Sequence, residues 1–304
     1  DRLCDDNRVV VDFALTVCSV RSYEGPGCTI VDIATSGPVA FGPFRLNEPG
    51  RLVVDLPGVW AANSPTVDVN SRSVTQVRVA QFAEGTARAV LDLGEAWAHS
   101  WDVSPDGRGI RLTVGSSPVF CRTVLIDAGH GGTDPGAVKD GVYEKDMNLD
   151  MALRLRQLLE ASGARVVMTR EDDSSVQLSD RSKLANETMP DAAISIHCNS
   201  TTWDIFPSGT ESYYFNAVPY SQELASLVHT CVVRELQLMD RKVRRGDYHM
   251  VRETRVPAVL VEVAFMSNGV DLQRLADPEF RQKAATGMFK GLSMYLGSEM
   301  FRKW

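Results

Sequence analysis

Two patterns of apolar and polar residues divide the chain near residue 117. Before that point, short runs alternate apolar with polar positions, and Gly, Pro, Asn and Ser separate the runs. An alternation with a period of two residues is typical of strands that have one buried face, and the separating residues favour turns. The pattern therefore predicts an all-β first half, with strands at 29–34, 51–56, 75–82, 87–93 and 110–114.

Two segments of this first half also resemble each other. Residues 30–56 and 89–114 each contain a strand ending in Asp, an aromatic middle and a Pro/Gly turn before another strand. Two similar β layers that face each other bury both of their apolar faces. We therefore predict a small all-β sandwich domain over residues 1–115, followed by a linker at 116–121.

The second half, residues 122–304, alternates strand patterns with helix patterns. The clearest helix begins at Glu144, and its apolar residues recur at helical spacing until Gly163. Such alternation predicts an α/β domain in which a mostly parallel sheet carries helices on both faces. Further strands are predicted at 123–128, 165–169, 192–197, 210–216 and 258–265, and further helices at 178–188, at 219–238 and from 277 onward.

Composition limits the possible partners. The 304 residues suffice for two domains of ordinary size, and the net charge of −7 disfavours nucleic acid or anionic membrane as the main partner. No apolar run approaches the ~20 residues that span a bilayer. The first residues lack a secretion signal, so we expect either a cytosolic protein or one whose signal has been removed.

The six cysteines indicate whether the protein works in a reducing or an oxidising compartment. None forms a CxxC pair, which argues against a cysteine-only zinc site and against a thioredoxin-like motif. Three lie within the first 28 residues, and this crowding favours a disulfide in an oxidising compartment. The pairing stays open among Cys4, Cys18, Cys28, Cys121, Cys198 and Cys231.

Four side chains are expected at one edge of the predicted sheet. His130 follows the first strand within a run of glycines, His197 closes another strand, and Glu144 begins a helix. Two histidines and one carboxylate form a Zn²⁺ ligand set that leaves one position open, as in catalytic zinc sites. Glu262 lies in an apolar strand, where an ionisable group is costly unless it has a chemical role. Taken singly, each histidine also fits a hydrogen-bonded structural role, and Glu144 fits a first-turn acid.

The motifs around these residues resemble a known family. "IDAGHGGTDPGA", "EKDMNL", "SIHCN" and "PAVLVEVAFMSN" are similar to the signature blocks of the zinc-dependent N-acetylmuramoyl-L-alanine amidases of the amidase_3 family, across 122–297. The resemblance implies that His130, Glu144 and His197 are the zinc ligands and that Glu262 is the catalytic acid/base. The implied reaction hydrolyses the amide between N-acetylmuramic acid and L-Ala of the stem peptide, with Zn²⁺ and no organic cofactor.

The first half resembles the AMIN domain through "VAFGPFRLNEPGRLVVDLPG". This resemblance implies a domain that binds peptidoglycan, and hence a periplasmic or secreted enzyme. Two alternatives remain at this point: a zinc carboxypeptidase that acts on cell-wall peptides, and a non-catalytic wall-binding module. The sequence also echoes the family around Arg181, Asn186 and Arg252, for which we expect supporting roles.

Three further expectations concern the surroundings of the site. Cys198 stands where the family usually has a small residue, and it is either an inert buried thiol or an oxidation-sensitive one. No second site is expected at His99, His229 or His249. About a dozen residues join His197 to the next strand, which leaves little room for a plugging helix. We therefore expect an open site that needs no activator protein, with rim or packing roles for Trp203 and Phe206.

Overall fold

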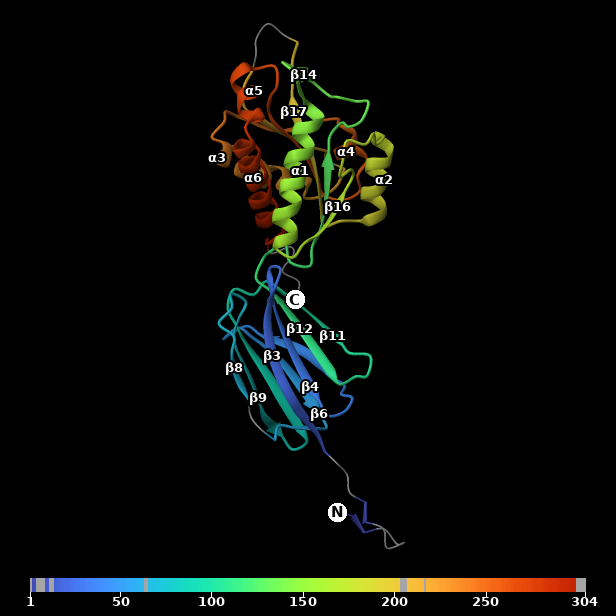
Figure 1. The fold of residues 1–304 in the computed structure, drawn as a ribbon, viewed down its shortest axis with the longest axis vertical. Coiled ribbons are helices and arrows are strands. Elements are labelled where there is room, and N and C mark those ends of the chain that lie inside the picture. Colours follow the sequence, from blue (N-terminus) through green and yellow to red (C-terminus); the bar gives the residue numbers. More distant parts are fainter. Residues whose placement is uncertain are drawn as a thin grey trace. The chain divides into compact units, whose positions relative to one another are not determined.

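The structure is a computed structural model, which describes residues 2–3, 9–10, 14–62, 65–202, 207–215 and 217–298. The chain divides into two compact units, Asp1–Ser117 and Pro118–Trp304 (Figure 1). Within the described residues, no helix is both long enough and apolar enough to cross a bilayer.

The N-terminal unit is a sandwich of two five-stranded sheets, as the alternating pattern predicts. Its core consists of inward-facing aliphatic residues such as Ile33, Leu56, Leu91 and Leu112. One sheet has the order β5 (Gly42–Leu46), β6 (Arg51–Pro57), β10 (Thr86–Leu93), β9 (Val74–Ala83), β8 (Thr66–Asp68). The other has the order β11 (Ala98–Val103), β12 (Gly109–Gly115), β4 (Cys28–Thr35), β3 (Leu15–Gly25), β7 (Val59–Trp60). A separate two-stranded pair joins β1 (Arg2–Leu3) to β2 (Val9–Val10).

The internal similarity has a structural counterpart. The first similar segment runs through β4, β5 and β6, and the second runs through β10, β11 and β12. The first strand of each segment pairs antiparallel with the last strand of the other, β4 with β12 and β10 with β6. An Arg–Asp ion pair spans each of these strand pairs, Arg111 with Asp32 and Arg88 with Asp55. The two segments therefore exchange strands between the sheets in the same way.

The C-terminal unit contains a six-stranded, mostly parallel sheet. Its order is β16 (Arg165–Met168), β13 (Thr123–Ala128), β17 (Ala192–Asn199), β20 (Ala258–Phe265), β18 (Thr210–Tyr214), β19 (Asp240–Arg245). The first four strands are parallel to one another, whereas β18 runs antiparallel to β20 and parallel to β19. A short hairpin, β14 (Val138–Lys139) with β15 (Val142–Tyr143), follows the first strand.

Helices cover both faces of this sheet, as predicted. The larger apolar core lies beneath α1 (Glu144–Ala161), α3 (Ser221–Leu236), α5 (Gly269–Ala276) and α6 (Pro278–Leu296). The smaller core lies beneath α2 (Leu178–Thr188) and α4 (His249–Glu253). Asp277 caps α6 by accepting the backbone N–H of Glu279, and Pro278 opens the helix, as expected for this pair of residues. The confirmed architecture brings the ends of the parallel strands β13, β17 and β20 to one edge.

Candidate active site

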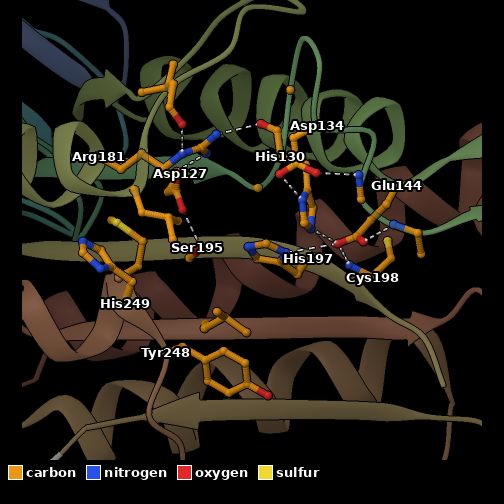
Figure 2. A pocket seen from close by; sticks show the side chains of 18 of the residues that line it. Asp127, His130, Asp134, Glu144, Arg181, Ser195, His197, Cys198, Tyr248 and His249 are labelled. Atoms are coloured by element: carbon orange, nitrogen blue, oxygen red, sulfur yellow. Dashed lines mark hydrogen bonds and ion pairs between the residues drawn. The ribbon is translucent and has the colours of Figure 1, made fainter. Parts of the chain in front are cut away.

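A cavity of about 710 Å³ lies at this edge, on the side of the sheet that α2 and α4 cover. It contains the four residues that the sequence singles out: His130 just beyond β13, Glu144 at the start of α1, His197 in β17 and Glu262 in β20. Figure 2 shows how the side chains of His130, Glu144 and His197 converge. The placement follows the rule that ligands of such sheets bind beyond the carboxyl ends of the strands.

Three of these side chains form a compact cluster. One potential ligand atom from each of His130, Glu144 and His197 lies within 4.8 Å of the others. Glu144 Oε1 is at the centre, 3.2 Å from His130 Nε2 and 3.1 Å from His197 Nδ1. Across the described part of the chain, no other group of three His, Cys, Asp or Glu converges in this way. Two nitrogens and one carboxylate oxygen suit a divalent metal such as zinc.

Hydrogen bonds fix the orientation of these side chains. Asp134 Oδ2 lies 2.8 Å from His130 Nδ1, which turns Nε2 toward Glu144. Glu144 Oε1 accepts the backbone N–H of Cys198 at 3.2 Å, and Oε2 accepts that of Ala137 at 2.9 Å. A carboxylate on the far nitrogen of a ligand histidine is the usual support of a metal site.

The backbone around His130 leaves room only for glycine at two positions. A Cβ on Gly129 would lie 2.2 Å from Cε1 of the His197 ring, and one on Gly136 would lie 2.6 Å from Glu144 Oε2. Gly136 also has a φ of +65°, and His130 itself adopts a φ of +61°. A positive φ is uncommon in a non-glycine residue, and strain of this kind is tolerated where the surrounding structure holds the backbone in place.

Two buried arginines hold the loop that carries His130. Arg181 donates hydrogen bonds to the carbonyl of His130 at 2.7 Å and to Asp127 Oδ1 at 2.8 Å. Arg170 donates to the carbonyls of Ala128 and Gly129, each at 2.9 Å. The carbonyls of Ala128, Gly129 and His130 therefore have hydrogen-bond partners, which stabilise the turn.

Charge is arranged around the cluster to hold positive groups. Burial opposes a charged ring, but hydrogen bonds and charges from Glu144 and Asp134 outweigh it and raise the pKa of His130 to about 9. Burial alone would also raise the pKa of Glu144, but hydrogen bonds from His130 and His197 lower it well below its usual range. A metal ion bound here would take the place of the proton on each ring nitrogen that faces Glu144.

Glu262 lies next to the cluster but outside it. It sits directly beside His197 in the register of β17 and β20, and it is 9% exposed. Burial, together with the charges of Glu144 and Glu211, raises its pKa to about 7, although His197 opposes the change. Among the described residues, no donor reaches the buried Glu262 Oε2 atom. A buried carboxylate oxygen without a partner calls for water or substrate.

The remaining candidate residues take different places. Asn186 anchors the segment after α4 by bonding the backbone of Glu253 and Arg255, and Arg252 forms ion pairs with Asp247 and Glu253. Neither Asn186 nor Arg252 lines the cavity. Trp203 and Phe206 lie outside the described residues.

Within the residues that the structure describes, the other histidines and the cysteines form no second cluster of potential metal ligands. His249 lines the same cavity and bonds Ser182 Oγ at 3.0 Å, and buried His229 joins Ser212 to Asp240. Burial raises the pKa of the Cys198 thiol, which favours the inert interpretation. Cys4 lies outside the described residues, so the disulfide stays a prediction.

Sequence reasoning missed the residues that support the cluster. Asp134 follows His130 by four positions inside the quoted glycine-rich motif, so that spacing was an available signal. Asn148 likewise follows Glu144 by four positions, within "EKDMNL", and donates to Glu144 Oε1. Arg170 carries no such signal, because its contact with the Gly129 carbonyl depends on how its segment packs.

Comparison with known families decides what kind of protein carries this site. Residues 124–294 match the family described as Amidase_3, N-acetylmuramoyl-L-alanine amidase, and residues 19–114 match the AMIN domain. The chain belongs to the Amidase_3 family. This assignment confirms the resemblance to the amidases and the expected enzyme class, and it gives no support to the carboxypeptidase alternative.

Individual relatives agree with the family. The germination-specific N-acetylmuramoyl-L-alanine amidase of Bacillus subtilis is 34% identical over 199 residues, which cover 59% of this chain and 82% of the relative. The crystal structure of an N-acetylmuramoyl-L-alanine amidase from Clostridium difficile 630 is 33% identical, with a TM-score of 0.57, and the match covers 59% of this chain and 98% of that one. The CwlD amidase of Clostridioides difficile, solved in complex with the GerS lipoprotein, is 31% identical with a TM-score of 0.55, covering 58% of this chain and 98% of that one.

Proposed function

We propose that this Amidase_3 chain hydrolyses the amide between N-acetylmuramic acid and L-alanine of peptidoglycan, with His130, Glu144 and His197 holding one Zn²⁺ and Glu262 serving as acid/base. The observation that carries the proposal is the cluster itself, three ligand atoms within 4.8 Å beside a buried carboxylate. The family match supports the reaction, and the donor set supports the metal.

The residues present fit zinc. Glu144 Oε1 lies within 3.2 Å of a nitrogen of each histidine, so all three groups face one point, and Asp134 supports His130 from behind. When bound there, Zn²⁺ supplies Lewis-acid activation of the amide carbonyl and of a water molecule.

The proton transfers fall to Glu262. As a carboxylate it takes a proton from water while the water oxygen attacks the carbonyl carbon of the lactyl group. It then gives that proton to the alanine nitrogen, and the C–N bond breaks, which leaves a carboxylic acid on the muramic acid and a free amine on the stem peptide; the acid then loses its proton to solvent at neutral pH. A pKa of about 7 in the free protein suits a group that must both accept and donate a proton near neutral pH.

Digestion of purified sacculi tests this function. The zinc-loaded protein is expected to release stem peptides with a free N-terminal alanine and to leave the glycan strands intact, as read by mass spectrometry. Release of single terminal amino acids instead would identify a carboxypeptidase and contradict the proposal.

The N-terminal sandwich is proposed to bind peptidoglycan, in keeping with its AMIN match. Aromatic side chains lie exposed on its strands, among them Phe82 and Trp101, which are 55% and 48% exposed. The Arg88 guanidinium stacks on the Phe82 ring, 3.2 Å from its centroid. Flat aromatic faces beside charged hydrogen-bonding groups suit a polymer of sugars and peptides.

The isolated segment 1–117 is expected to fold and to sediment with sacculi, because its core is separate from that of the catalytic unit. Sedimentation with purified sacculi measures this, and the catalytic segment 118–304 is the comparison. Recovery of 1–117 no greater than that of an unrelated β protein would reduce the domain to a spacer.

The amidase and AMIN matches both suggest a protein that acts outside the cytoplasm. We propose the periplasm or the extracellular space, where peptidoglycan is present.

We also propose that the enzyme works without an activator protein. Only residues 200–209 separate the end of β17 from β18, too few for a helix and its two connections. Deletion of 201–207 is therefore expected to change the rate of stem-peptide release from sacculi less than about threefold, since no plug is removed. A many-fold rise on deletion would show that this segment occludes the site.

A further inference from the structure

A side-chain hydrogen bond joins β17 to β18 across β20, the strand that carries Glu262. Asn199 ends β17, Glu211 lies in β18, and these two strands are the neighbours of β20 in the sheet. Asn199 Nδ2 donates to Glu211 Oε2 at 2.9 Å. Glu211 also lies directly opposite Glu262 in the register of β18 and β20. The bridge therefore crosses β20 close to the proposed acid/base.

Glu211 is a fixed acceptor. Its side chain is buried, and Arg241 Nε donates to Oε1 at 2.9 Å while the Tyr213 hydroxyl donates to Oε2 at 2.7 Å. The Arg241 guanidinium also forms an ion pair with this carboxylate. An ionised carboxylate has no proton to donate.

The Glu211 carboxylate determines the orientation of the Asn199 side-chain amide. Because Glu211 only accepts, the amide nitrogen must face it, and the carbonyl oxygen Oδ1 must point the other way. Asn199 lines the cavity, and in the described part of the chain no donor contacts Oδ1. Asn199 and Glu262 both line the cavity, so Asn199 adds a neutral acceptor to the residues around it.

We propose that Asn199 binds substrate through Oδ1, which accepts the N–H of the scissile amide, and that Glu211 is the positioning residue that sets its orientation. The inference rests on the proposed function. The scissile carbonyl must face the metal ligands, and the nitrogen must face Glu262 to receive its proton. In a trans amide the N–H points away from the carbonyl oxygen, so it needs an acceptor on the side of Glu262.

This contact would strengthen during the reaction. When Glu262 protonates the nitrogen, just before the C–N bond breaks, the nitrogen becomes cationic, and a carbonyl acceptor binds a cationic N–H more tightly than a neutral one. Interactions that are stronger in the transition state raise kcat rather than lower KM. The simpler alternative is that the bridge only ties β17 to β18, in which case its loss would affect every reaction at the site equally.

An amide and an ester separate the two interpretations. A soluble muropeptide is compared with an analogue in which oxygen replaces the scissile N–H, which removes the donor and keeps the carbonyl. Asn199→Ala is expected to lower kcat about tenfold to a hundredfold on the amide, with KM little changed, and to change the ester rate less than about threefold. Glu211→Gln, which can turn the Asn199 amide, is expected to give a smaller loss with the same selectivity for the amide.

The matched control is Thr202→Ala, an exposed side chain in the same segment. Metal content and the thermal midpoint of each variant are measured alongside. Equal losses of Asn199→Ala on amide and ester, or no loss on either, would overturn the assignment. A wild-type protein that cleaves neither compound would instead contradict the proposed function, so the two failures are distinguishable.

Discussion

Glu262→Gln is expected to remove nearly all turnover while the protein keeps its metal. The substitution preserves shape but removes the group that accepts and returns the proton, so the rate of stem-peptide release should fall about 10²–10⁴-fold. Metal content should stay at the wild-type value, because the three clustered groups are His130, Glu144 and His197. The control is Glu187→Gln, an exposed carboxylate of α2 with a side chain 64% exposed. Near-normal activity of Glu262→Gln would remove Glu262 from the mechanism.

The pH profile adds a second measurement of the same residue. Glu262 must be ionised to take a proton from water, so kcat/KM should fall as pH falls through its pKa. That pKa is about 7 without metal, and the charge of a bound cation would lower it. The acid limb of the wild type is therefore expected at or below about pH 7, and the residual activity of Glu262→Gln should lack it.

Glu262→Gln should raise the stability of the metal-free protein, although it lowers the activity. The pKa of Glu262 is raised in the folded state, so the cost of burying its charge is absent below the unfolded-state pKa near 4.5 and fully present above about 7. Removing that charge should stabilise the metal-free protein at pH 8 by up to about 3 kcal/mol, the free energy that corresponds to this pKa difference. Denaturant unfolding of both forms at pH 5 and pH 8 measures it, with the larger difference expected at pH 8.

The sequence predicts the elements that have strong apolar patterns. Strand β20 consists entirely of buried residues, so its apolar run marks it with the correct bounds, Ala258–Phe265. Strand β19 was missed, because its sequence "DRKVRR" has neither an apolar run nor an alternating apolar face. It is an edge strand, where charged residues discourage pairing with other molecules. Strand β19 can be identified only from its pairing with the neighbouring strand β18.

The residues of the candidate site also differ in whether the sequence alone predicts their position. His130, Glu144, His197 and Glu262 stand in motifs at strand or helix ends, where topology alone brings them to one edge. Glu211 sits in a strand that was predicted, but nothing in "TESYYF" indicates that it lies opposite Glu262. That contact depends on β18 running antiparallel to β20. Strand direction is set by how the chain connects and packs, which local patterns do not encode.

His197→Ala is expected to remove both metal and activity. The ring is one of three clustered groups and is also a hydrogen-bond partner of Glu144, so its loss leaves two of the three proposed ligands and a less firmly held carboxylate. Loss of a supporting partner alone typically weakens metal binding 10–100-fold, and loss of a ligand should weaken it by more than about a hundredfold. Metal analysis after dialysis, with stem-peptide release from sacculi, measures both effects. The matched control is the neighbouring residue, because Cys198 belongs to the buried apolar core and its bond to Glu144 comes from the backbone. Cys198→Ala should therefore keep the metal and lose only about 1 to 2 kcal/mol of stability. A His197→Ala protein that retained one tightly bound zinc would show that the metal is held elsewhere.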